Sequence, residues 1–202
     1  MTSASVRCRE PGWHRLRQLG LAVRATTLVE GLRAARRGRP LVTVGDVGAW
    51  ALARVEAEPD PPDAVLELLG IPDGTGNDPD SLADAERTLG PLVAAEQAAH
   101  VDPRAELAKW RVVDLAALID LIATWPLDPA EDFDGRPCSM WSACRELWSH
   151  WAELLDRPPF FYPGGRECRC YDGRMFEDVI AEYRAWLAAE VARLRALDGA
   201  AG

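Results

Sequence analysis

The spacing of apolar residues constrains this chain most, because it recurs at the three- and four-residue steps of an α-helix. The clearest stripe covers residues 140–155 and contains Met140, Trp141, Cys144, Leu147, Trp148, Trp151, Leu154 and Leu155. A stripe of this kind buries one face of a helix against its neighbours. Strand-like alternation is hard to find elsewhere, so the sequence predicts an all-α bundle.

Start and stop signals divide the chain into about six or seven helices. Gly38 and Pro40 end a first helix over residues 13–37, and Thr43 caps a second helix that runs to residue 55, with Asp46 in its first turn. Further helices are expected at 63–69, from Asp80 or Ser81 to 99 with a kink or division at Gly90-Pro91, at 103–124, at 140–155 and at 176–194. The sequence leaves room for one short hairpin near residues 160–176.

A chain of 202 residues is long enough for one domain with a sizeable core, so metals and disulfides are not needed to hold it. We expect a flexible N-terminus at 1–12 and a single helical domain at 13–202. Asp114 and Asp120 interrupt the longest apolar run, so no membrane span is predicted. The N-terminus lacks the apolar stretch of a secretory signal, which predicts a cytoplasmic protein with reduced cysteines.

Charge is unevenly distributed along the chain. The formal net charge is -9, and the stretch from Glu56 to Glu86 contains ten acidic residues and no Lys or Arg, whereas residues 1–40 are rich in Arg. An acidic surface repels nucleic acid and attracts basic proteins. The predicted partner-binding residues lie in this stretch and in a second acidic loop: Asp73, Asp78, Asp80, Asp84, Asp128, Glu131, Asp132 and Asp134.

The sequence contains no recognised catalytic motif. It has three histidines, and no G-x-S-x-G, H-E-x-x-H, P-loop or dinucleotide-binding pattern occurs. These absences favour a binding protein over an enzyme, and no cofactor is predicted. Pairs of carboxylates acting as acid and base remain an alternative, given the many Asp and Glu residues.

No metal site is predicted either. Cys138, Cys144 and His150 stand six residues apart, which rotates each about 120° from the last around a helix. Cys168 and Cys170 form only a C-x-C pair, although folding could bring another ligand near them. The loop that starts at Asp73 partly resembles a calcium loop, but it lacks the glycine at its sixth position and the glutamate at its twelfth.

Eight tryptophans are many for this length, and three of them fall on the helix at 140–155. Their spacing matches the buried stripe, so a core role is the simplest interpretation. The alternative is an aromatic pocket formed by Trp141, Trp148, His150 and Trp151. With that pocket the chain would be an enzyme or a cofactor-binding accessory protein of a bacterial biosynthetic pathway.

Three segments, LVTVGDVGAWALARV, DAVLELLGIPDGTGND and AELAKWRVVDLAALID, precede an acidic DPAEDFDG. This layout, over residues 41–135, resembles that of small helical bacterial immunity proteins from polymorphic-toxin loci. The resemblance implies stoichiometric binding to a cognate toxin without catalysis. We therefore expect an acidic binding protein that neutralises or regulates a basic protein partner through residues 56–86 and 128–134.

Overall fold

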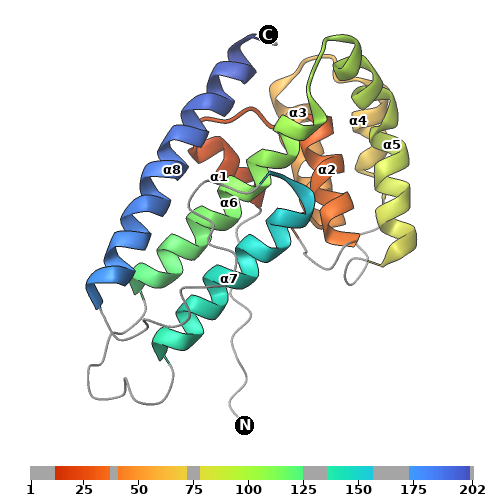
Figure 1. Cartoon of the computed structure of the whole chain (residues 1–202). Coiled ribbons are helices and arrows are strands. Elements are labelled where there is room, and N and C mark those ends of the chain that lie inside the picture. Colours follow the sequence, from red (N-terminus) through yellow and green to blue (C-terminus); the bar gives the residue numbers. More distant parts are fainter. Residues whose placement is uncertain (1–11, 37–40, 72–77, 125–135, 157–172, 201–202) are drawn as a thin grey trace. The chain divides into compact units, whose positions relative to one another are not determined.

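The computed structural model describes residues 12–36, 41–71, 78–124, 136–156 and 173–200 (Figure 1). Its regular elements within these ranges are all helices, which confirms the predicted all-α class. They are α1 (Gly12–Gln18), α2 (Ala25–Arg36), α3 (Val44–Ala57), α4 (Asp63–Leu68), α5 (Pro79–Ala98), α6 (Pro103–Thr124), α7 (Arg136–Leu154) and α8 (Gly173–Ala200). No helix in the described part of the chain is both long and apolar enough to cross a lipid bilayer.

The helices form two compact units. The first comprises residues 1–110 with 194–202, and the second comprises residues 111–193. In the first unit α5 packs against α2, α3 and α4, and α3 also packs against α1 and α4. The buried face of this group is made of aliphatic side chains, among them Leu28, Leu32, Val47, Val65, Leu68, Leu82 and Leu89.

The expected single helix over residues 13–37 is wrong, because the chain breaks it after Gln18. Gly20 has a φ of 65°, the left-handed conformation that glycine adopts without steric cost. The Gly20 N–H donates to the Arg17 carbonyl over 2.9 Å, and the Leu21 N–H donates to the Leu16 carbonyl over 2.9 Å. This pair of bonds is a Schellman motif, which ends α1 and turns the chain into the segment 19–24.

A distant carboxylate starts α2. Glu96, near the end of α5, accepts hydrogen bonds from the backbone N–H groups of Ala25 and Thr26 at 2.9 and 2.8 Å, and from the Thr26 hydroxyl at 2.6 Å. The first N–H groups of a helix have no partner within the helix and carry a partial positive charge. Glu96 provides both the hydrogen-bond acceptors and the negative charge, and its bonds link α5 to α2.

The local signals for α3 to α6 place most boundaries correctly. Thr43 and Asp46 form a reciprocal capping box at the start of α3. The cap of α5 is Asp78, followed by Pro79 in the first turn, so this helix begins slightly before the expected Asp80 or Ser81. The structure does not divide α5 at Pro91, which is exposed. The expected bounds of the helix at 103–124 are confirmed by α6.

The second unit is built from the later part of α6, α7 and the earlier part of α8. Trp148 packs edge-on against Tyr183 and Trp186, with ring centroids 5.6 Å apart in both pairs. Arg111 lies 4.8 Å from the centroid of the Trp186 ring and donates to Glu190 over 3.1 Å. The expected hairpin at 160–176 falls mostly outside the described residues, but residues 173–176 belong to α8.

Candidate functional site

The acidic stretch from residue 56 to residue 86 covers the end of α3, all of α4 and the start of α5. Three of its carboxylates pair with arginines: Glu58 with Arg54 and Glu86 with Arg33, both at 2.8 Å, and Asp84 with Arg87 at 2.6 Å. Five others are exposed and have no cationic partner among the described residues: Glu56, Asp60, Asp63, Glu67 and Asp80. The negative charge of this stretch is therefore only partly compensated.

Exposed leucines accompany these acids. Of the five most exposed large apolar side chains in the described residues, Leu52 lies on α3, Leu66 on α4 and Leu69 at the end of α4. On α4 the buried side chains are Val65 and Leu68. Helical geometry puts Leu66 on the outer face of α4 together with Asp63 and Glu67, with Asp63 between the other two around the helix axis. We call the exposed side chains Leu66, Asp63 and Glu67 the α4 outer face.

The predicted partner-binding aspartates have different surroundings. The Asp78 carboxylate accepts hydrogen bonds from the backbone N–H groups of Asp80 and Ser81 at the start of α5. A hydrogen bond from the Ser81 hydroxyl, together with these backbone bonds, lowers the pKa of the Asp78 carboxyl group. Asp84 pairs with Arg87, whereas the exposed Asp80 makes no ion pair with the described residues. Asp73, Asp128, Glu131, Asp132 and Asp134 lie outside the described residues.

The tryptophans proposed as an aromatic pocket belong to α7, in the second unit. Trp148 and Trp151 are buried, and the indole N–H of Trp151 donates to Asp114 over 3.0 Å. His150 packs edge-on against Trp151, with ring centroids 5.5 Å apart. Trp141 lies in α7, but its side chain is outside the described part of the structure.

The cysteines considered as metal ligands are only partly described. Cys168 and Cys170 lie outside the described residues, and Cys138 belongs to α7 without a described side chain. Cys144 is buried, and burial raises the pKa of its thiol to about 11 although a hydrogen bond with Tyr183 opposes the shift. In the ranges that the structure describes, no three His, Cys, Asp or Glu residues are arranged to hold a metal ion.

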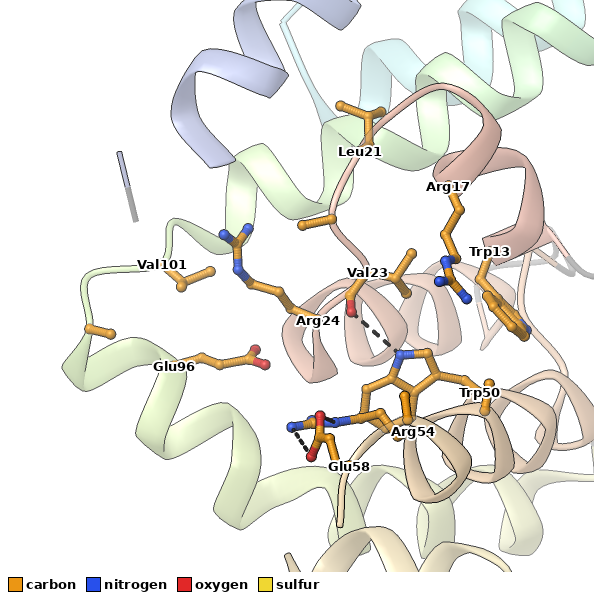
Figure 2. Close-up of a pocket in the computed structure, with 14 residues that line it drawn as sticks. Trp13, Arg17, Leu21, Val23, Arg24, Trp50, Arg54, Glu58, Glu96 and Val101 are labelled. Atoms are coloured by element: carbon orange, nitrogen blue, oxygen red, sulfur yellow. Dashed lines mark hydrogen bonds and ion pairs between the residues drawn. The ribbon is translucent and has the colours of Figure 1, made fainter. Parts of the chain in front are cut away.

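A second feature of the first unit is a cavity of about 480 Å³, which the sequence does not predict. Figure 2 shows its lining, which comes from α1, the segment 21–24, α3 and the residues at the end of α5. Its apolar walls include Trp13, Trp50, Leu21 and Val101. We call this space the Trp13–Trp50 pocket.

Two arginines of the pocket lie over tryptophan rings. Arg17 is 5.9 Å from the centroid of Trp13, and Arg54 is 5.3 Å from the centroid of Trp50. Arg54 also donates to both oxygens of Glu58, at 2.8 and 3.2 Å. Exposed Arg17 has no carboxylate partner among the residues that the structure describes.

A third arginine, Arg24, connects the pocket wall to a group of buried charges. It pairs with Glu106 over 3.0 Å and also contacts the Asp198 carboxylate. Lys109, only 1% exposed, donates to Glu106 over 2.7 Å and to Asp198 over 2.8 Å. We call Arg24, Glu106, Lys109 and Asp198 the buried charge cluster. Its two cations and two carboxylates balance, and it holds the segment 19–24 against α6 and the end of α8.

Comparison of the chain with protein-family models, with curated proteins and with solved structures found no match.

Proposed function

We propose that this chain is a non-catalytic cytoplasmic binding protein, whose α4 outer face docks a basic protein partner. The observation that carries the proposal is the 46% exposed Leu66 on the same face of α4 as Asp63 and Glu67, two carboxylates without a cation among the described residues. An exposed apolar side chain with charged neighbours is typical of an interface with a central anchor and a polar rim.

Charge defines the kind of partner. Glu56 and Asp60, next to α4 in the sequence, add two more carboxylates that pair with no cation in the described ranges, and the whole stretch 56–86 contains no Lys or Arg. Unmatched charge of one sign weakly destabilises a folded protein, so stability does not explain this bias and a role in recognition does. A basic surface would be steered to these residues, and Leu66 would supply the apolar contact.

The resemblance over residues 41–135 suggests a specific form of this function. An immunity protein neutralises a toxin by occupying its active-site cleft, and an acidic surface suits a cleft that is basic because it binds nucleic acid. In this proposal the chain acts stoichiometrically, and its partner is encoded beside it.

Affinity capture from the native host tests the proposal. The tagged chain should retain a basic protein at a one-to-one ratio, measured by quantitative mass spectrometry. The triple variant Asp63→Asn, Leu66→Ser, Glu67→Gln should retain at least about tenfold less, because an anchor and its rim together contribute more than about 1.4 kcal/mol. With the purified partner, the variant should also associate more slowly and with a flatter salt dependence.

The matched control is Asp178→Asn with Leu197→Ser. Both residues are exposed, and both lie on α8. The control should capture as much partner as the wild type. Equal capture by wild type and triple variant, or a captured protein without a basic surface, would refute the proposed docking face.

A further inference from the structure

We propose that the Trp13–Trp50 pocket binds a small molecule with a flat apolar body and one anionic group. This inference is independent of the proposed protein-binding face, since it rests on other residues of the first unit.

The size and walls of the pocket define the body of the ligand. A volume of about 480 Å³ lies within the range of small-molecule sites. The indole rings of Trp13 and Trp50 line the cavity and are only 3% and 4% exposed, so they are fixed, apolar parts of its wall against which a flat ligand can pack. Leu21 and Val101 extend the apolar lining. These walls favour a planar or aromatic molecule over a sugar or a simple inorganic ion.

The charges of the lining define the polar group of the ligand. The ionised side chains are three arginines, Arg17, Arg24 and Arg54, against two glutamates, Glu58 and Glu96. Glu96 accepts three hydrogen bonds at the start of α2, so this carboxylate is already satisfied. Arg24 is likewise held by Glu106 and Asp198. The groups that remain for a ligand are therefore Arg17, Arg54 and Glu58.

Arg17 and Arg54 can both turn to an anion at low cost. Arg17 has no carboxylate partner among the described residues. The pair between Arg54 and Glu58 joins side chains that are 31% and 39% exposed, and ion pairs of that exposure are weak in water. Figure 2 shows Arg17 reaching from α1 toward Trp50, whereas Arg54 and Glu58 lie below that ring. A guanidinium group binds a carboxylate, sulfonate or phosphate through two parallel N–H donors.

Two matched probes separate the apolar from the anionic contribution. The probe 8-anilinonaphthalene-1-sulfonate is a flat aromatic anion, and N-phenyl-1-naphthylamine is the same skeleton without the sulfonate. Fluorescence titration should show one sulfonate site per chain. The uncharged probe should bind at least about tenfold more weakly, because a hydrogen bond to a charged group contributes about 1.5–3 kcal/mol.

Variants then assign the site to the pocket. Arg17→Gln with Arg54→Gln should weaken sulfonate binding at least about tenfold and leave the uncharged probe unchanged. Ala57→Trp, which places a large ring at an exposed residue of the lining, should weaken both probes. Arg87→Gln is the charge control, because Arg87 is exposed on α5 and does not line the pocket. Circular dichroism and thermal melting check that each variant is folded.

Three outcomes would overturn the inference: equal binding of the two probes, sulfonate binding that survives both arginine substitutions, and sulfonate binding that survives Ala57→Trp. The last would place the probe elsewhere, for example on the exposed leucines. None of these outcomes affects the proposed docking face, because the triple variant of α4 and the pocket variants share no residue.

Discussion

The ammonium group of Lys109 lies 2.8 Å from the Asp198 carboxylate, so the single lysine of the chain joins α6 to the C-terminal end of α8 inside the first unit. The same ammonium group donates to the Ala22 carbonyl over 2.8 Å and to both oxygens of Glu106. Three segments that are distant in sequence thus meet at one buried cation. Because Ala22 and Arg24 also line the Trp13–Trp50 pocket, the buried charge cluster supports its wall.

Replacing Lys109 by Met should destabilise the first unit by about 3 kcal/mol. Methionine fills a similar volume, but of the two cations in the cluster Glu106 and Asp198 would keep Arg24 alone, and a buried charge that loses its partner costs about 3–5 kcal/mol. Urea denaturation followed by circular dichroism measures the change. Arg87→Gln removes an exposed ion pair on α5 and should change the free energy of unfolding by less than about 1 kcal/mol. Similar effects of the two substitutions would contradict this account of the cluster.

The buried charge cluster should also make stability depend on pH. Burial raises the pKa of Asp198, but hydrogen bonds from Lys109, Ala22 and Arg24 and the charge of Lys109 outweigh it, so the pKa lies below its ordinary value of 3.8. The folded state therefore binds this proton less readily than the unfolded state. The stabilisation from Asp198 is complete above the unfolded pKa and is lost as the pH falls through the folded pKa.

Asp198→Asn isolates this contribution, since asparagine does not titrate. We expect the free energy of unfolding of the wild type to exceed that of the variant near neutral pH. The difference should shrink as the pH falls below about 4, where the carboxyl group of the unfolded chain becomes protonated. Urea titrations at a series of pH values measure it. A difference that stays constant with pH would show that the Asp198 carboxylate is not stabilised in the folded state.

Local sequence signals predict the helices well where both ends are marked by nearby residues. Thr43 and Asp46 form their cap within one turn, and Asp102 with Pro103 marks the start of α6. The break between α1 and α2 shows where such local signals fail to predict a helix end. Apolar spacing continues through Leu16, Leu19 and Val23, but the left-handed Gly20 ends α1, and Glu96, about seventy residues away, caps α2.

The candidate sites also differ in how much of them the sequence predicts. Clustered acids are visible in the sequence, although only the structure shows that Asp78 is a helix cap and that Glu67 has no cationic partner among the described residues. The Trp13–Trp50 pocket could not be predicted, because its residues occur singly in separate segments and no spacing connects them. Lys109 offered a signal, since a single lysine on a mostly apolar helix is a candidate for a buried pair.

A steric test of the first unit uses two glycines in helix interiors. A Cβ atom at Gly31 of α2 would lie 2.3 Å from a methyl group of Val42 and 2.8 Å from the ring of Trp110, both of which are buried. Gly31→Ala should therefore destabilise the unit by about 2 kcal/mol, because the packed neighbours must move. Thermal or urea unfolding measures the loss.

Gly48→Ala is the matched control for this steric effect. A Cβ atom at Gly48 of α3 would meet nothing within 4 Å, so the substitution should stabilise the protein by about 0.5–1 kcal/mol through the better helix propensity of alanine. The two substitutions are chemically identical and should have opposite signs. The same sign for both would show that α2 does not approach Val42 and Trp110 as closely as described.

The last prediction concerns Cys144 of α7, whose thiol should resist alkylation as long as the second unit is folded. Cys144 is 2% exposed, and burial raises the pKa of its thiol to about 11, with a hydrogen bond from Tyr183 opposing the shift only in part. At about pH 8 roughly one thiol in a thousand would be the reactive thiolate. Iodoacetamide labelling followed by mass spectrometry of the peptide containing Cys144 should show little modification in buffer and complete modification in concentrated urea. Tyr183→Phe removes the hydrogen bond but not the burial, so the protection should persist in that variant if it remains folded. Rapid labelling of Cys144 in the folded wild type would mean that the thiol is accessible and ionised, and α7 would then have to be reconsidered as a site of cysteine chemistry rather than as a packing helix.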